Sequence, residues 1–271
     1  MTADGAPPPG EAVDVQDLLI LCYHAVSPSW HSFLAVDPER LRQQVRWLLR
    51  RGYKPMTLSD AVAQPRAGKR LVVTFDDGYR SILGRGLPVL RALDVPATAF
   101  IQTDLADEGG RFAALPEEEM PADPAQLDTM SWEEVRQLDA AGWEIGSHTR
   151  SHPHLEQIPR EQAAAELRES RRRCEEELQH ECRTIAYPFG TYDAGVMELT
   201  AAAGYTAAVT LENRMFEPIV DRTPLDLPRE GVFNQTRMPK FLVNVSPTIR
   251  RLRLSPLYAR YARGRLASSH G

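Results

Sequence analysis

Short apolar runs alternate along this chain with longer amphipathic stretches. The apolar runs lie at 18–23, 71–75, 97–102, 143–147, 184–187 and 206–211. Most of them are apolar on successive residues, which is typical of parallel strands that are covered on both faces. We therefore predict six buried strands at these positions.

The stretches between these runs have the spacing of helices. Predicted helices cover 38–51, 87–93, 132–141, 160–178 and 194–203. The first is predicted to have Asp37 as its N-cap residue, Pro38 in its first turn and Gly52 at its end. Repeated alternation of strand and helix predicts right-handed βα units, and hence an α/β barrel or an open parallel sheet. Two segments interrupt the alternation: 105–130, which we expect to be a lid or a disordered insertion, and 212–230.

Composition and charge limit the class of protein. The 271 residues are 42% apolar and 25% charged, as in an ordinary globular protein. The net charge of −5 gives no overall basic field for nucleic acid. Residues 250–271 nevertheless contain six arginines and no acidic residue. This basic tail is expected either to contact an anionic membrane surface peripherally or to be a solvated helix or disordered segment.

The ends and the cysteines suggest an intracellular protein. Residues 1–17 are acidic and rich in proline and do not resemble a secretory signal, so we expect a disordered N-terminus, a barrel domain at 18–245 and a basic tail at 246–271. The apolar runs fall short of the roughly 20 residues that span a bilayer. Three cysteines without a CxxC pair do not form a disulfide framework, and we expect Cys22 to be buried and inert. These features predict a cytoplasmic location, with the inner membrane face as an option.

Candidate chemistry follows two of the predicted strands. The run 71–75 leads into Asp76, Asp77 and Gly78, and the run 143–147 leads into His148 and, four residues later, His152. One carboxylate and two imidazoles provide three metal ligands and leave an open position, as in a catalytic zinc site. Each motif alone is often only a turn or a surface pair. Their placement at the same end of one sheet, where the active sites of βα folds assemble, favours a functional site.

Three blocks carry a resemblance to a known family. The segments TFDDGY (74–79), GSHTRSHPHL (146–155) and AYPFGTYD (186–193) resemble the motifs of the NodB-type polysaccharide deacetylases, carbohydrate esterase family 4, and the resemblance covers roughly 18–235. It implies an α/β fold, a distorted (β/α) barrel with about seven strands. It also implies that Asp76 is the catalytic base and that Asp77, His148 and His152 hold one divalent ion, most simply Zn²⁺, with Co²⁺ or Ni²⁺ as alternatives.

The order of the motifs is similar to a permuted subgroup that deacetylates β-1,6-linked poly-N-acetylglucosamine. The early segment LCYH (21–24) then makes His24 the general acid, against the alternative of a hydrogen-bonded histidine at a strand end. The resemblance assigns the oxyanion and substrate contacts to the turn at Tyr187, Pro188 and Phe189, where a backbone N–H of Phe189 would serve.

The base lacks one usual partner. Many family members begin the third block with an arginine that orients the base, whereas this chain has Ala186 there. Arg229 is a candidate substitute, and the alternative is an ordinary surface arginine. The family's fourth block, which contains Asp and Trp, is not recognisable in this sequence.

Three functions remain open at this point. The first is a metal-dependent hydrolase that removes N-acetyl groups from an N-acetylhexosamine in a glycan or glycoside. The second is a hydrolase of other non-peptide C–N bonds, such as cyclic imides or small amides, on the same fold. The third is a carbohydrate-binding protein whose catalytic site has decayed, which the missing arginine and fourth block would explain.

Overall fold

The structure is a computed structural model that describes residues 17–64, 68–112, 115–211, 222–253 and 255. All but one residue of the predicted disordered segment 1–17 lies outside this range, as does most of the basic tail. The described start of the tail forms helix α9 (Pro247–Arg253), where Arg250 donates a hydrogen bond to the carbonyl of Leu18. The domain boundary at 245 stays a prediction. Within the described ranges, no helix combines the length and the apolar character needed to cross a membrane.

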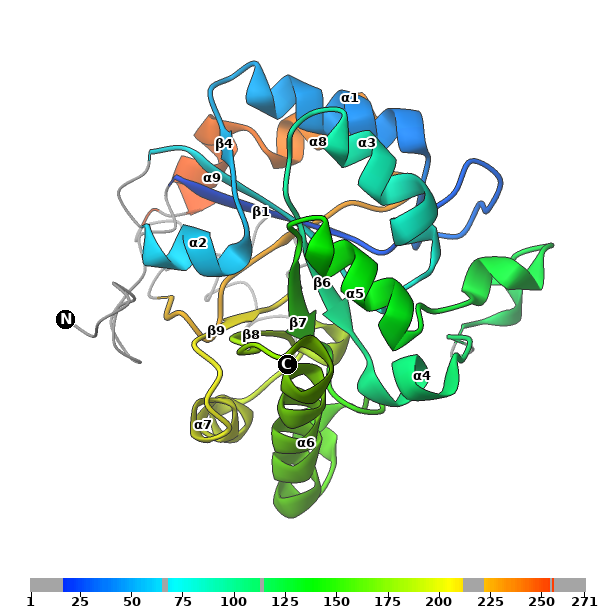
Figure 1. The fold of residues 1–271 in the computed structure, drawn as a ribbon. Helices are drawn as coiled ribbons and strands as arrows, with labels where there is room; N and C mark the ends of the chain where they lie inside the picture. Colours follow the sequence, from blue (N-terminus) through cyan, green and yellow to red (C-terminus); the bar gives the residue numbers. More distant parts are fainter. Residues whose placement is uncertain (1–16, 65–67, 113–114, 212–221, 254, 256–271) are drawn as a thin grey trace, which may run out of the picture.

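A curled parallel sheet occupies the centre of the molecule (Figure 1). Over the described residues, seven strands follow one another in space, and a short strand, β4 (Lys54–Pro55), pairs with one of them. This confirms the predicted α/β barrel of about seven strands. The seven are, in spatial order, β10 (Glu230–Gly231), β1 (Leu18–Tyr23), β5 (Arg70–Phe75), β6 (Thr98–Ile101), β7 (Glu144–Ser147), β8 (Thr184–Ala186) and β9 (Ala207–Val209).

The two faces of this sheet are covered by different apolar clusters. Every residue of β1 and β5 is buried, and side chains alternate between the faces along each strand. Leu18, Ile20 and Val72 belong to a small cluster inside the curl, which α2 (Leu58–Ala63) fills from the amino ends of β6 and β7. The intervening residues face the outer helices. The interior is therefore packed at one end and free to hold a site at the other.

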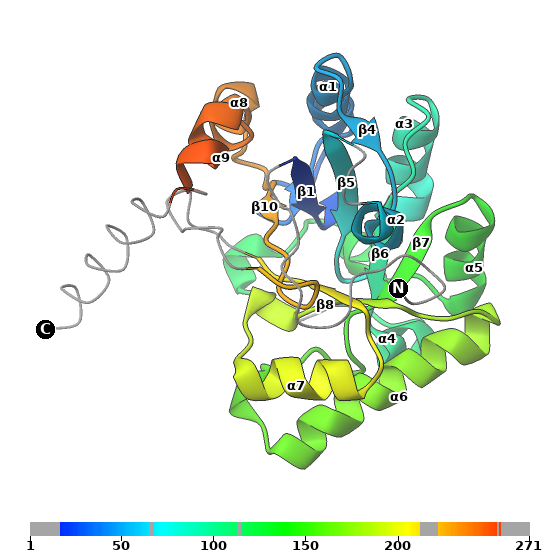
Figure 2. The same cartoon turned by 90° about the vertical axis from the view of Figure 1, so that its left-hand side faces the viewer.

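The outer helices surround the sheet (Figure 2). Asp37 caps the first of them as predicted, because its carboxylate accepts hydrogen bonds from two backbone N–H groups, and the bounds of α6 agree with the predicted 160–178. The outer helices are α1 (Pro38–Leu49), α3 (Leu87–Arg91), α4 (Thr103–Glu108), α5 (Trp132–Ala140), α6 (Arg160–Leu178), α7 (Ala194–Ala202), α8 (Met238–Asn244) and α9.

The segment after β9 joins the two edges of the curled sheet. Leu227 forms a parallel bridge with Val209 of β9, and the Thr210 N–H donates to the Leu227 carbonyl at 2.9 Å. A few residues later β10 pairs with β1, and the Val232 N–H donates to the Cys22 carbonyl at 2.8 Å. Because the segment runs from one edge of the sheet to the other, it carries Arg229 into the interior of the curled sheet.

Two excursions of the chain meet beside the carboxyl end of the sheet. The loop between β2 (Ala25–Val26) and β3 (Ala35–Val36) holds Trp30, whose indole N–H donates to the Glu119 carbonyl at 2.8 Å. The Glu119 carboxylate also accepts from the Phe33 N–H at 2.9 Å. The described part of 105–130 is thus folded and bonded to this loop, and is not a disordered insertion. Whether it acts as a lid stays a prediction.

Candidate active site and metal centre

The side chains singled out in the sequence gather at the carboxyl ends of neighbouring strands. Asp76 and Asp77 follow β5, His148 follows β7, and His24 follows β1. Asp77 has a φ of 66°, in the left-handed region that favours glycine. This turn directs two adjacent carboxylates into one site, a conformation that the surrounding structure must hold in place.

Asp77, His148 and His152 form a compact cluster. The Oδ1 atom of Asp77 lies 3.5 Å from Nε2 of each histidine, and the ligand atoms of all three residues lie within 4.8 Å of one another. The two imidazole rings are 4.7 Å apart at an angle of 73°. The Gln102 side-chain amide donates to the same Oδ1 at 3.3 Å, an interaction that the sequence did not indicate.

The donor set fits a divalent cation. The Nδ1 of His148 lies 2.8 Å from the Ala186 carbonyl, which can only accept, so Nδ1 carries the proton. In the neutral imidazole Nε2 is then a lone-pair atom that faces a carboxylate, and two acceptors repel unless a cation lies between them. A carbonyl that fixes the tautomer of a histidine is also the usual support of a metal ligand.

The pKa values of this cluster reflect the opposing effects of burial and of neighbouring charges. Burial lowers the pKa of His148, but the contact with Asp77 and the charges of Asp76 and Asp77 together outweigh it, and the net shift is upward. Burial and the neighbouring His148 lower the pKa of His152 to about 4. Burial raises the pKa of Asp77, but the contact with His148 and the charges of the neighbouring histidines together outweigh it, and the net shift is downward. At neutral pH the cluster therefore offers an ionised carboxylate and at least one neutral imidazole.

Glu166 of α6 holds the loop that presents His152. Its carboxylate accepts from the backbone N–H of Arg150 at 2.9 Å, from that of Ser151 at 3.1 Å and from the Ser151 hydroxyl at 2.7 Å. The loop needs this support because Thr149 and His152 have φ values of 66° and 59°. Glu166 was missed in the sequence, where it is one of many glutamates in a polar helix.

Arg229 lies directly against Asp76. Its Nη1 donates to Oδ1 and its Nη2 to Oδ2, both at 2.7 Å, and the side chains of both residues are buried. The guanidinium also donates to Thr74 Oγ1 at 3.0 Å and to the Thr210 carbonyl at 2.9 Å. Arg229 is therefore not a surface arginine. Burial raises the pKa of Asp76, but Arg229 outweighs it and holds that pKa well below its usual range.

His24 lies close to Asp76. Its ring reaches within 4.8 Å of a carboxylate oxygen of Asp76, and it stacks on Phe233 with the ring centroids 6.2 Å apart. Burial lowers the pKa of His24, partly offset by the nearby carboxylates. Its Nδ1 is buried and has no hydrogen-bond partner among the described residues, so this imidazole is not simply a satisfied strand-end histidine.

A cavity of about 220 Å³ is lined by His24, Asp76, Asp77, His148 and His152. The turn 188–190 contributes Phe189, with φ 59°, and Gly190, with φ 72°, where a Cβ would come within 2.4 Å of the Leu211 backbone nitrogen. The Tyr187 side chain is buried, and its hydroxyl donates to the Leu225 carbonyl at 2.9 Å. The described lining includes Phe189 and Gly190 of this turn but neither Tyr187 nor Pro188, whose expected substrate contacts stay a prediction.

Apolar walls complete the cavity, and the sequence did not reveal them. Phe189 stacks on His154 with the ring centroids 3.8 Å apart and contacts the edge of His152 at 4.6 Å. Because the aromatic and aliphatic wall residues come from irregular segments, their spacing gave no periodic signal. They are Phe33, Leu34, Phe112, Leu115, Leu211 and Phe233.

A curled βα sheet with an Asp-His-His cluster at its carboxyl end is the arrangement of a barrel hydrolase with a candidate metal site. The chain matches the polysaccharide deacetylase family over residues 63–208. It therefore belongs to the polysaccharide deacetylase family, as its sequence motifs indicated.

Several curated proteins are similar to this chain. YxkH of Bacillus subtilis is 26% identical over 72% of this chain and 64% of its own length. The poly-β-1,6-N-acetyl-D-glucosamine N-deacetylase of Escherichia coli K12 is 27% identical over 80% of this chain and 38% of its own length. The chain thus spans less than two thirds of the length of these relatives.

Solved structures share the fold. The deacetylase PplD of Streptococcus pyogenes, in complex with acetate, superposes with a TM-score of 0.68 at 24% identity, over 85% of this chain and 98% of PplD. IcaB of Ammonifex degensii gives a TM-score of 0.66 at 23% identity, over 83% of this chain and 94% of IcaB. At these identities the likeness shows the fold alone.

Proposed function

We propose that this chain is a metal-dependent hydrolase that removes N-acetyl groups from an N-acetylhexosamine unit of a glycan or glycoside. The observation that carries the proposal is the convergence of two sets of side chains in one cavity. Asp77, His148 and His152 place their ligand atoms within 4.8 Å of one another, and Asp76 lies beside them in the grip of Arg229. Relatives named as poly-β-1,6-N-acetyl-D-glucosamine N-deacetylases support a β-1,6-linked substrate.

Asp77, His148 and His152 would hold the ion, for which Zn²⁺ is the first choice and Co²⁺ or Ni²⁺ fit the same mixed donors. When bound there, the ion supplies Lewis-acid chemistry that activates water and the amide carbonyl. The ionised Asp76 accepts a proton from the attacking water, because its low pKa keeps it deprotonated at neutral pH. His24, which also lines the cavity, delivers a proton to the departing amine.

The apolar walls suit an acetylated sugar. A pyranose has apolar faces as well as hydroxyl groups, and Phe33, Phe189 and Phe233 present rings at the cavity mouth. The Phe189 backbone N–H would face the oxyanion as the acetyl group is attacked. The products are acetate and a free amino sugar.

Arg229 weakens the argument for a decayed site. That alternative rested on the missing arginine and the missing fourth block, and the buried guanidinium removes the first ground because it gives Asp76 a cation from a different segment of the chain. Hydrolysis of other C–N bonds is an arm of the test below, and peripheral membrane contact through the basic tail stays a prediction. We also propose a cytoplasmic location, as the sequence predicted.

The test is acetate release by the purified full chain after loading with Zn²⁺ or Co²⁺. The substrates are β-1,6-linked and β-1,4-linked N-acetylglucosamine oligomers, with a cyclic imide and a simple amide in parallel. Asp76→Asn should retain about one ion per chain and lose at least about a hundredfold in kcat, since a general base contributes that much. Asp77→Ala should lose the ion itself, which elemental analysis after gel filtration measures.

Asp94→Asn is the matched control, because Asp94 is exposed and asparagine tolerates its positive φ of 56°. It should behave as the parent. Acetate release that is equal in Asp76→Asn and the parent would contradict the proposed mechanism. Turnover confined to the imide or the simple amide would instead establish the second function.

A further inference from the structure

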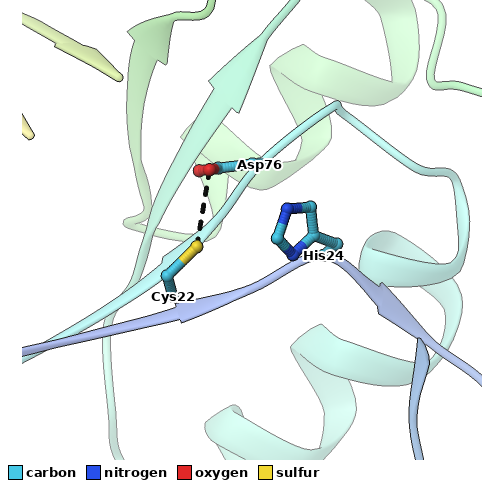
Figure 3. A group of neighbouring side chains, drawn as sticks. All are labelled: Cys22, His24 and Asp76. Atoms are coloured by element: carbon cyan, nitrogen blue, oxygen red, sulfur yellow. Dashed lines mark hydrogen bonds between the residues drawn. The ribbon is translucent and has the colours of Figure 1, made fainter. Parts of the chain in front are cut away.

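Cys22 contacts the carboxylate to which we assign the role of base. Its Sγ lies 3.4 Å from Asp76 Oδ2, and Figure 3 shows the thiol directed at that oxygen, with the His24 ring beside the pair. The contact follows from the strand pairing: Cys22 lies opposite Thr74 in the β1–β5 register, and the Asp76 N–H donates to the Tyr23 carbonyl at 3.0 Å. Cys22 is fully buried and does not line the described cavity.

The thiol must be the donor in this pair. Arg229 can only donate, so both oxygens of Asp76 act as acceptors toward it, and a carboxylate in that state offers no proton to sulfur. Burial keeps the proton on the thiol by raising the pKa of Cys22. Asp76 therefore receives three donors in all from two side chains.

These three donors are unevenly divided between the two oxygens. A carboxylate has about four lone-pair sites, two on each oxygen. Arg229 Nη1 uses one site on Oδ1, whereas Arg229 Nη2 and the Cys22 thiol use both sites on Oδ2. Among the described contacts, the remaining lone pair is on Oδ1.

We propose that Cys22 is a positioning residue that saturates Oδ2 of Asp76 and so makes Oδ1 the oxygen that accepts the proton from water. The assignment of a proton acceptor rests on the proposed function, but the hydrogen bond itself does not. Cys22, His24 and Asp76 are also of the residue types that bind metals, with ligand atoms within 4.8 Å of one another. The guanidinium already neutralises Asp76 and its positive charge would repel a second cation there, which argues against that role.

The first experiment measures the hydrogen bond without any need for activity. The S–H stretching band of Cys22 is assigned by infrared difference between the parent and Cys22→Ser, and is then followed in Asp76→Asn. A neutral amide oxygen is a weaker acceptor than a carboxylate, so the band should move to higher frequency. A band that stays in place would overturn the proposal even if the protein proves not to be a deacetylase.

The second experiment measures kcat and KM for acetate release. Cys22→Val, which fills the space without a donor, should lower kcat about three- to tenfold, the usual worth of one hydrogen bond, and leave KM unchanged. Cys22→Ser restores a donor and should recover most of kcat. Cys174→Val, at a second fully buried thiol on α6, is the matched control for packing damage and should leave kcat unchanged.

Two kinds of outcome would refute the role of Cys22. Equal losses of kcat in the Val and Ser variants, or no loss in Val, would show that the thiol donor does not tune the base. Two ions per chain in the parent and one in Cys22→Val would identify Cys22 as a metal ligand instead. If Cys22→Val fails to fold, as judged by circular dichroism, Cys22→Ala takes its place as the variant without a donor. A parent without deacetylase activity refutes the proposed function and leaves the infrared result to decide on the hydrogen bond.

Discussion

Replacing Arg229 by methionine should destabilise the protein strongly, because it removes the only described cation that touches Asp76. The change deletes four hydrogen bonds of the guanidinium, to Asp76 twice, to Thr74 and to the Thr210 carbonyl. Asp76 is 3% exposed, so water cannot replace them without rearrangement of the site. A methionine has a similar length and leaves the carboxylate as an uncompensated buried charge.

The size of the effect follows from that buried charge. Breaking a buried ion pair from one side costs about 3–5 kcal/mol, whereas removal of both partners can be nearly neutral. Arg229→Met should therefore lower the free energy of unfolding by about 3–5 kcal/mol at neutral pH. The double variant with Asp76→Asn should recover part of this loss, with a coupling energy of about 1–3 kcal/mol.

The loss should also depend on pH in a defined direction. In the parent, burial raises the pKa of Asp76 and Arg229 overrides it, so the folded pKa is depressed. The stability that this group contributes is then present above its unfolded pKa of about 3.9 and is lost as the pH falls toward the folded value. In the variant only burial remains dominant, so the folded pKa rises and the penalty is relieved by protonation as the pH falls.

Urea unfolding, followed by circular dichroism in the presence of a chelator, measures both effects without a contribution from bound metal. We expect the difference between parent and Arg229→Met to be larger at about pH 7.5 than at about pH 5, for the linkage reason given above. A difference below about 1 kcal/mol at the higher pH, the value of an ordinary exposed ion pair, would refute the argument. So would a difference that is the same at both pH values.

Two further substitutions test the supports of the site. Glu166→Ala should weaken Zn²⁺ binding about 10- to 100-fold while the barrel stays folded, since residues that support metal ligands have that influence. Competition with a chromogenic chelator measures the affinity, and Glu161→Ala, at an exposed position of the same helix, is the control. Equal Zn²⁺ affinities of the two variants would count against the role of Glu166. Gly190→Ala should displace the turn and lower kcat at least about tenfold, because its Cβ would meet the Leu211 backbone nitrogen at 2.4 Å. Gly109→Ala, with φ 64° and no atom within 4 Å of the added Cβ, measures the cost of the positive φ alone, and identical effects of the two alanines on kcat would exclude the steric explanation.

Much of the fold could be predicted because its signals are local. The six strands are buried on both faces, so each appears as a continuous apolar run, and all six occur in the structure. Asp37 marked the start of the first helix because capping depends on a side chain next to the backbone groups that it satisfies. Elements of two residues, such as β10, left no such run and were missed.

The candidate ligands could be named from sequence because parallel strands end at one edge. Asp77 and His148 each follow a predicted strand, and that rule alone brings them together. The walls of the cavity could not be named in this way. Phe33, Phe112 and Phe233 come from three irregular segments, and only the folded chain shows that they face a common space.

Arg229 shows why a missing motif residue is weak grounds for inferring a lost function. The physical requirement is a cation against the buried carboxylate of Asp76, and it is independent of the strand that supplies the cation. The residue at position 186 lies in β8, whereas Arg229 arrives just before β10, 153 residues after Asp76, on the segment that joins the two ends of the sheet. Sequence order separates these positions widely, but the curl of the sheet brings both toward the same interior. A buried carboxylate without a cation in its own motif therefore predicts that another segment provides one, here the segment that joins the two edges of the sheet.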